Sequence, residues 1–167
     1  MKRLLMTAGA LAVLALASVT EAQAGNSAAV YQSGYNNSGS FVQKGNYNQG
    51  TLRTSGNKNY SKAVQQGRWN YLYQQQLGNR NRALTDQYGD SNYAVTGQQG
   101  VDNSSATYQT GRSNTAGTAQ IGTNHTALTD QYGTNNTAAT IQVGNNQNAQ
   151  THQVGDGNMS VIIQGGD

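Results

Sequence analysis

A glycine recurs every eleven residues along most of the chain, and this spacing constrains the fold more than any other feature of the sequence. No insertion or deletion interrupts the period between residue 34 and residue 166. A fixed period of this kind is typical of a repeat protein, in which each unit packs on its neighbours. The glycines that we expect at turns are Gly34, Gly45, Gly56, Gly67, Gly78, Gly89, Gly100, Gly111, Gly122, Gly133, Gly144 and Gly155.

Amide side chains hold two further places in nearly every unit. Gln stands two residues before each glycine, except at Thr54, and Asn stands three residues after it, except at His125 and Gln147. We expect these amides to form the ladder that lines the core. The Gln residues are Gln32, Gln43, Gln65, Gln76, Gln87, Gln98, Gln109, Gln120, Gln131, Gln142, Gln153 and Gln164. The Asn residues are Asn37, Asn48, Asn59, Asn70, Asn81, Asn92, Asn103, Asn114, Asn136 and Asn158.

The fixed positions of the unit are separated by two residues. After each Asn comes a small residue such as Ala83, then in mid-chain a Thr such as Thr85, then the next Gln. Side chains two apart lie on the same face of a β-strand, so the fixed residues are predicted to point inward and the variable ones outward. Each unit then consists of about seven strand residues and about four turn residues, with the glycine in the turn. The fold class predicted is all-β: an amyloid-like parallel β-solenoid (β-helix) of about six two-strand coils built from eleven-residue half-repeats.

The first 24 residues resemble an export signal. Lys2 and Arg3 precede an apolar stretch from Leu4 to Val19, and the small-x-small site Ala22-Gln23-Ala24 follows. This order is typical of a cleaved secretory signal peptide. An uncleaved membrane anchor is the alternative, but the stretch is short for a span. We expect a signal peptide at 1–24, a repeat domain at 25–167, secretion, and no membrane span in the mature chain.

Composition limits what can hold such a fold together. The chain has no Cys, so no disulfide can stabilise it, and no Pro, which would interrupt strand pairing. Ordering each residue costs about 1 to 2 kcal/mol, and the small inward side chains bury too little apolar surface to offset this. Hydrogen bonds between backbone strands and between stacked Gln and Asn amides must supply the rest. Disorder of the isolated monomer is the alternative that this polar composition leaves open.

The ends of the predicted solenoid favour self-association. Solenoids usually cover their terminal strands with a cap, because an open edge recruits other strands. We expect no cap here, and the last predicted strand carries Val161, Ile162 and Ile163 without a charge. Head-to-tail growth into a cross-β fibre is therefore predicted.

The repeated sequence motif resembles that of a known family. Gln-x-Gly-x-x-Asn-x-Ala-x-x-x-Gln, seen at 87–98 and at 131–142, is similar to the curlin repeat of curli subunits, the secreted functional amyloids of bacterial biofilms. The resemblance covers the chain from about residue 26 onward. It implies export through the outer-membrane curli secretion machinery, a second curlin subunit as partner, and adhesive fibres at the cell surface. It does not distinguish the major fibre subunit from the minor subunit that nucleates the fibre.

Charge is distributed unevenly along the mature chain. Basic residues come first, from Lys44 to Arg82, and acidic residues dominate from Asp86 onward. This polarity is predicted to favour head-to-tail addition. Basic residues interspersed with aromatic ones also suggest binding to extracellular DNA or polysaccharide. The aromatic residues in question are Tyr60, Trp69, Tyr71 and Tyr73.

Enzyme chemistry is not indicated. His125 and His152 occupy different places in the unit, so they do not suggest a metal site, and we expect both to be structural. Asp86 and Asp130 are expected to face outward two coils apart, which is unsuitable for an acid–base pair. No cofactor, metal or catalytic residue is predicted. The remaining alternatives are a soluble β-solenoid that binds ice or glycans through an outward row of Thr, and a β-helical enzyme with a carboxylate cleft.

One unit departs from the pattern. In the unit at 65–75, Leu72 replaces the small residue and Gln74 replaces Thr, while Arg68 and Trp69 occupy the turn. We expect a local distortion here, with a recognition site as the alternative.

Overall fold

The computed structural model describes residues 25–166, which form thirteen β-strands and no helix. The signal peptide predicted at 1–24 lies outside these residues. The strands are β1 (Ser27–Tyr35), β2 (Ser38–Asn46), β3 (Gln49–Asn57), β4 (Tyr60–Arg68), β5 (Tyr71–Asn79), β6 (Arg82–Asp90), β7 (Tyr93–Val101), β8 (Ser104–Arg112), β9 (Thr115–Thr123), β10 (Thr126–Thr134), β11 (Thr137–Asn145), β12 (Asn148–Asp156) and β13 (Met159–Gly166).

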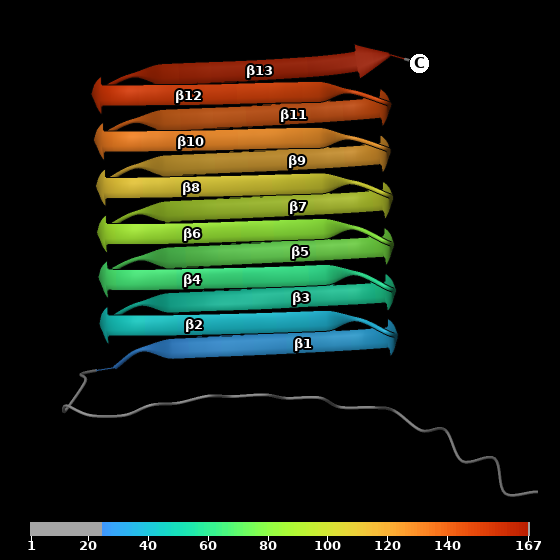
Figure 1. Cartoon of the computed structure of the whole chain (residues 1–167), viewed down its shortest axis with the longest axis horizontal. Helices are drawn as coiled ribbons and strands as arrows, with labels where there is room; N and C mark the ends of the chain where they lie inside the picture. Colours follow the sequence, from blue (N-terminus) through green and yellow to red (C-terminus); the bar gives the residue numbers. More distant parts are fainter. Residues whose placement is uncertain (1–24, 167) are drawn as a thin grey trace, which may run out of the picture.

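The strands wind into a two-sheet parallel β-solenoid (Figure 1). Odd-numbered strands form a seven-stranded sheet in the order β1-β3-β5-β7-β9-β11-β13, and even-numbered strands form a six-stranded sheet from β2 to β12. All pairs are parallel and in register at a separation of 22 residues, as in the pairing of Gln87 with Gln109. The predicted fold class, with two half-repeats in each of about six coils, is confirmed.

The strands are longer and the turns shorter than the sequence suggested. Each strand except β13 has nine residues, and only two residues separate it from the next strand. The expectation of about seven and about four was wrong because the glycine stays in the ladder while its backbone bends. Gly111, for example, has φ of 128°, and a Cβ at this position would lie 2.0 Å from the carbonyl oxygen of Gly133. Only glycine fits where adjacent coils approach so closely.

A second backbone bend follows two residues after the glycine. The residue there has a left-handed conformation although it is usually not glycine, as at Trp69 with φ of 60° and Asp102 with φ of 58°. Such a backbone conformation is strained for a residue that has a Cβ atom. A backbone hydrogen bond to the preceding coil holds it in place, since the amide of Asp102 donates to Asn79 O at 3.1 Å.

The interior between the two sheets is narrow and mostly polar. Buried residues include the small ones, such as Ala83 and Ala94, the Thr residues, such as Thr85, and the Gln and Asn residues. The only hydrophobic cluster in the described region joins Leu52, Ala63 and Leu72, with Phe41 packed against it. The prediction that fixed residues point inward is confirmed, and the Thr row that an ice- or glycan-binding face would need is buried.

The unit at 65–75 is not distorted. β5 pairs in full register with β3 and with β7. Leu72 joins the hydrophobic cluster, while Gln74 accepts a hydrogen bond from Ser61 Oγ at 2.7 Å and donates one to Thr85 Oγ1 at 2.6 Å. The larger side chains therefore fit because two adjacent coils offer them packing and hydrogen-bond partners.

Candidate functional site

The Gln residues stack directly above one another inside the solenoid. Gln87 Nε2 donates to Gln109 Oε1 at 2.9 Å, and it also donates to the backbone oxygen of Tyr71 in the facing sheet at 3.0 Å. Both amide hydrogens are thus used, and Oε1 of Gln87 accepts from Gln65 at 2.8 Å. The same three bonds recur along both sheets, so the ladder ties each coil to the next and also joins the two sheets. The fully buried members are Gln65, Gln76, Gln87, Gln98, Gln109, Gln120, Gln131 and Gln142.

The Asn residues form a second ladder at the turns. Asn92 Oδ1 accepts from the backbone amide of Asn114 at 3.1 Å, and its Nδ2 donates to Gly111 O at 3.1 Å and to Tyr88 O at 3.3 Å. The backbone amide of Asn92 in turn donates to Asn70 Oδ1 in the preceding coil at 3.0 Å, so each Asn links its own turn to the coils on either side. The buried members are Asn48, Asn59, Asn70, Asn81, Asn92, Asn103, Asn114 and Asn136, with Asn37 and Asn158 in the same role nearer the ends.

His125 replaces Asn in this ladder and is structural, as predicted. Its ring is fully buried, Nδ1 accepts from the backbone amide of Gln147 at 3.3 Å, and Nε2 lies 3.2 Å from Ile121 O. The side chain of His152 is exposed on the outer surface, where Nδ1 lies 3.5 Å from Asp130 Oδ2 and the ring packs edge-on against Tyr132.

One defect interrupts the Gln ladder. Gln32 in β1 faces Thr54 in β3, which has no amide oxygen to accept a hydrogen bond. As a result Gln32 Nε2 is buried and makes no hydrogen bond among residues 25–166. On its other side Thr54 Oγ1 lies 3.5 Å from Gln76 Oε1, which is a weak contact.

The ladder has a direction, and this gives the two ends of the described solenoid different chemistry. In every hydrogen bond between two Gln residues of the ladder, the donor is the one nearer the β1 end and the acceptor the one nearer the β13 end. At the β13 end, Gln153 and Gln164 each use one amide hydrogen on a backbone oxygen, at 3.0 and 2.9 Å, and have no further Gln to donate to within the described chain. At the β1 end, Gln32 and Gln43 have no Gln donating to them within the described chain. Donors at one end therefore match acceptors at the other.

Backbone groups are also left free at both ends. Within the described residues, β1 and β2 pair on one side only, and so do β12 and β13. Figure 1 shows these strands at opposite ends of the stack. An unpaired strand edge is a template for another strand.

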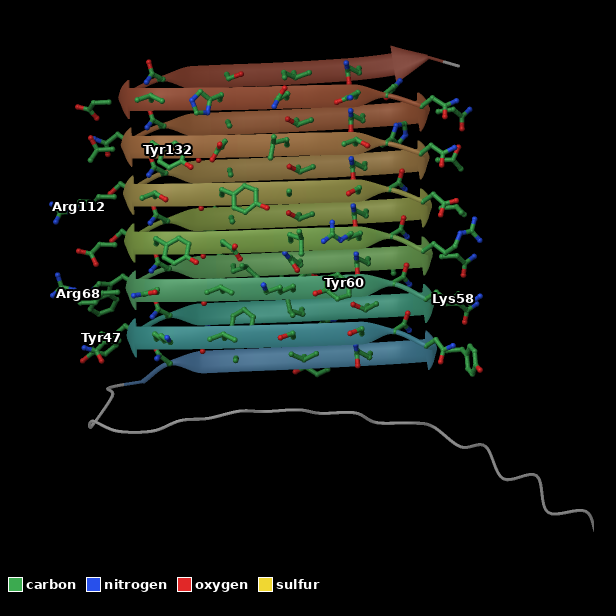
Figure 2. The ribbon with its side chains drawn as sticks, viewed as in Figure 1. Tyr47, Lys58, Tyr60, Arg68, Arg112 and Tyr132 are labelled. Carbon is green, nitrogen blue, oxygen red and sulfur yellow. The ribbon has the colours of Figure 1, made fainter. Side chains whose placement is uncertain are left out.

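Charged residues lie along the turns and pair at the 22-residue spacing. Asp90 lies 3.2 Å from Arg68 and 3.7 Å from Arg112, and Arg80 lies 2.6 Å from Asp102. The hydrogen bond from Arg68 lowers the pKa of Asp90, and that from Arg80 lowers the pKa of Asp102. Arg68 and Arg112 project from one edge of the solenoid in Figure 2. These pairs were missed from the sequence, although opposite charges at the same place two units apart are a signal that could have revealed them.

The predicted nucleic-acid or polysaccharide residues do not converge. Trp69 lies at a turn, where it stacks on Tyr47 with ring centroids 4.2 Å apart. Tyr60 is on the even-numbered sheet, whereas Tyr71 and Tyr73 are on the odd-numbered sheet. Because these side chains occupy three different surfaces, they do not make one binding site.

The expectation that Asp86 and Asp130 face outward two coils apart is confirmed. Asp86 and Asp130 lie in one outward row with Tyr108 between them. Partial burial raises the pKa of Asp86, opposed by the charge of Lys62. Residues 25–166 contain no group of three or more His, Asp or Glu side chains that could hold a metal ion.

Comparison with known proteins adds no relative. No protein-family model matches the chain, and no curated protein matches it. In the described part of the chain, no helix is long and apolar enough to cross a membrane. The curlin resemblance therefore rests on the repeat residues themselves.

Proposed function

We propose that this protein is a structural subunit of a secreted, curli-type amyloid fibre that grows by head-to-tail addition of solenoids. The observation that carries the proposal is the direction of the Gln ladder. The β13 end offers amide hydrogens from Gln153 and Gln164, and the β1 end offers amide oxygens from Gln32 and Gln43. A second copy completes both sets without any change of fold.

The ends are also suited to addition in energetic terms. A hydrogen bond formed within a protein contributes about 1 kcal/mol net, and each junction restores two strand pairings besides the amide bonds. Inside the solenoid every coil is bonded on both sides, whereas each terminal coil is bonded on one side. A long stack therefore leaves no more hydrogen bonds unmade at its ends than a short stack does, which favours growth.

The number of strands determines how successive copies are oriented in this fibre. The described region has seven strands in one sheet and six in the other, so the next position in the winding after β13 lies against β12. An added copy places its β1 there and its β2 against β13. Gln153 then faces Gln32 of the next copy, and Gln164 faces Gln43. Successive subunits are related by a half turn about the fibre axis.

The resemblance to curlin repeats and the predicted signal peptide support a location outside the cell, in an adhesive matrix. They also suggest the curli secretion machinery and another curlin subunit as partners. The same end chemistry suits a minor subunit that nucleates the fibre. The two roles differ in stoichiometry, so the ratio of this chain to other subunits in isolated fibres distinguishes them.

Two neighbouring substitutions in β13 test the proposal. Ile162 points inward and pairs with Thr140, whereas Ile163 points outward and is 71% exposed. Ile162→Lys places a charge in the junction, and it should abolish growth of thioflavin-binding fibres from residues 25–167. Ile163→Lys should leave elongation intact. Wild-type chains that stay single, compact particles, or equal growth of both variants, would contradict the proposal.

A further inference from the structure

The outer surface of the odd-numbered sheet carries one charge within its strands, Arg53 in β3, whereas that of the even-numbered sheet carries several. We define the uncharged face as the outward side chains of β5, β7, β9, β11 and β13. None of them is charged. The even-numbered sheet instead carries Lys44, Lys62, Arg82, Asp86 and Asp130 on its outer surface.

The uncharged face is also broad and carries several exposed aliphatic side chains. Ile121, Ile141 and Val143 are 47%, 39% and 44% exposed, and Val161 and Ile163 lie further along the same sheet. With about 4.8 Å between strands and about 3.3 Å per residue, five strands of about nine residues cover roughly 700 Å². This area includes uncharged polar side chains such as Gln75 and Gln99 beside the aliphatic ones. Exposed aliphatic side chains gathered on one face often mark a binding surface.

The uncharged face has a shallow hollow, and the side chain of Ile141 projects beside it. Gly97 and Ala119 lie at the floor of the hollow, with Leu77 and Ile121 among its walls. A Cβ added to Gly97 would meet no atom within 4 Å, so the hollow is open. Ile141 stands next to Ala119 in the same outward row and projects above it.

We propose that the uncharged face binds the same face of a second copy, which joins solenoids side by side. When one copy is turned end for end with β9 over β9, β7 of each copy lies over β11 of the other. Ile141 of each then enters the hollow at Gly97 of its partner. About 700 Å² from each copy lies within the range of stable interfaces, which is about 600 to 1,000 Å² per partner.

The chemistry of the face favours a copy of itself over other occupants. A face without charge offers nothing to a nucleic acid or an acidic polysaccharide, which bind to cations. Two uncharged sheets can instead interdigitate at about 10 Å, as paired amyloid sheets do. This inference goes beyond the proposed fibre, because two folded solenoids are enough for the contact. Within a fibre whose subunits alternate by a half turn, the face occurs on both sides, so several filaments can join laterally.

A matched pair of valines provides the test. Val143 lies on the uncharged face and Val154 on the opposite sheet, at the same place in consecutive units, and both are exposed. Electron-microscopic mass per length is measured for wild-type, Val143→Lys and Val154→Lys filaments. Wild-type and Val154→Lys filaments should have at least twice the mass per length of Val143→Lys filaments, at both low and high salt, because the contact is uncharged.

Equal mass per length for the two variants, or wild-type filaments one solenoid wide, would overturn the inference. Retained thioflavin binding by Val143→Lys shows that folding and elongation survive. If the wild-type chain forms no fibre, the proposed function fails, and pairing is tested separately by sedimentation of the folded chains. Dimers of wild-type and Val154→Lys with monomeric Val143→Lys support the inference, and a monomeric wild type overturns it.

Discussion

Gln87 and Gln109, both fully buried, are joined by a hydrogen bond of 2.9 Å between Nε2 of the first and Oε1 of the second. The remaining hydrogen of Gln87 Nε2 goes to Tyr71 O in the other sheet at 3.0 Å. A buried amide costs free energy only when its hydrogen bonds are unmade. This pairing explains how a chain with few apolar residues can bury its Gln side chains.

Removing one rung of the ladder should be costly. Gln109→Leu leaves the amide of Gln87 and the oxygen of Gln131 without their partners. The expected loss is about 2 to 3 kcal/mol, the penalty for stranding buried polar groups. Guanidinium unfolding of the folded chain measures it. Gln66→Leu, an exposed position on the outer surface, serves as the control and should change stability by less than about 0.5 kcal/mol.

Repairing the ladder should stabilise the protein. Gln32 Nε2 is buried without a partner because Thr54 interrupts the row. Thr54→Gln supplies the missing oxygen at a place that accommodates Gln in other coils. A gain of about 1 kcal/mol is expected from the hydrogen bond, seen as a higher denaturation midpoint. Thr54→Val, which adds no acceptor, should give no such gain, and an equal effect of both would rule out the hydrogen bond as the cause.

Substitution by alanine should destabilise the protein at glycines that lie against the next coil but not at glycines with open space around them. A Cβ at Gly111 would lie 2.0 Å from Gly133 O, and its φ is 128°, whereas a Cβ at Gly117 would meet nothing within 4 Å. Gly111→Ala is expected to lose more than about 2 kcal/mol through backbone displacement and strain. Gly117→Ala should be tolerated. Similar unfolding midpoints for the two variants would show that close approach of the coils does not require glycine.

The pH dependence of stability should include a term from Asp86. Partial burial raises its pKa, so the folded state binds the proton more tightly than the unfolded state. Its contribution is present below the unfolded pKa and is lost as pH rises through the folded pKa. At neutral pH Asp86→Asn should therefore raise the free energy of unfolding modestly. It should also reduce the increase in stability that protonation of Asp86 gives the wild-type chain as pH falls. Asp130→Asn, at the same place in the row, removes the contact with His152 and should bring no gain. Unfolding midpoints between pH 3 and pH 7 (about the range that spans an Asp titration) provide the measurement.

Much of this architecture could be predicted because one short pattern dictates it. The alternation of fixed and variable residues identified the inward face, and the period of eleven identified the coil, since side-chain direction on a strand depends only on parity. Turn length could not be predicted, because a glycine with positive φ can remain in a ladder while the backbone bends at Gly111 and its equivalents. The regular fit of Leu72 and Gln74 was also missed, because their packing depends on partners in adjacent coils.

The surfaces proposed for assembly could likewise be predicted only in part. The ladder residues were identifiable by their repetition, but the direction of the ladder and the second bond to the facing sheet, as from Gln87 to Tyr71, depend on three-dimensional geometry. The uncharged face was equally hidden, because its members are variable residues taken from alternate units. The outward residues differ from unit to unit, so no repeat in the sequence marks them. Only the stacking of odd-numbered strands brings these side chains together.

Helical reconstruction of filaments grown from residues 25–167, by electron cryomicroscopy, tests the central claim most directly. The account predicts an uninterrupted ladder in which Gln153 and Gln164 meet Gln32 and Gln43 of the next subunit, with strands about 4.8 Å apart and a half turn between subunits. Filaments joined through other surfaces, or preparations that contain only separate solenoids, would contradict it.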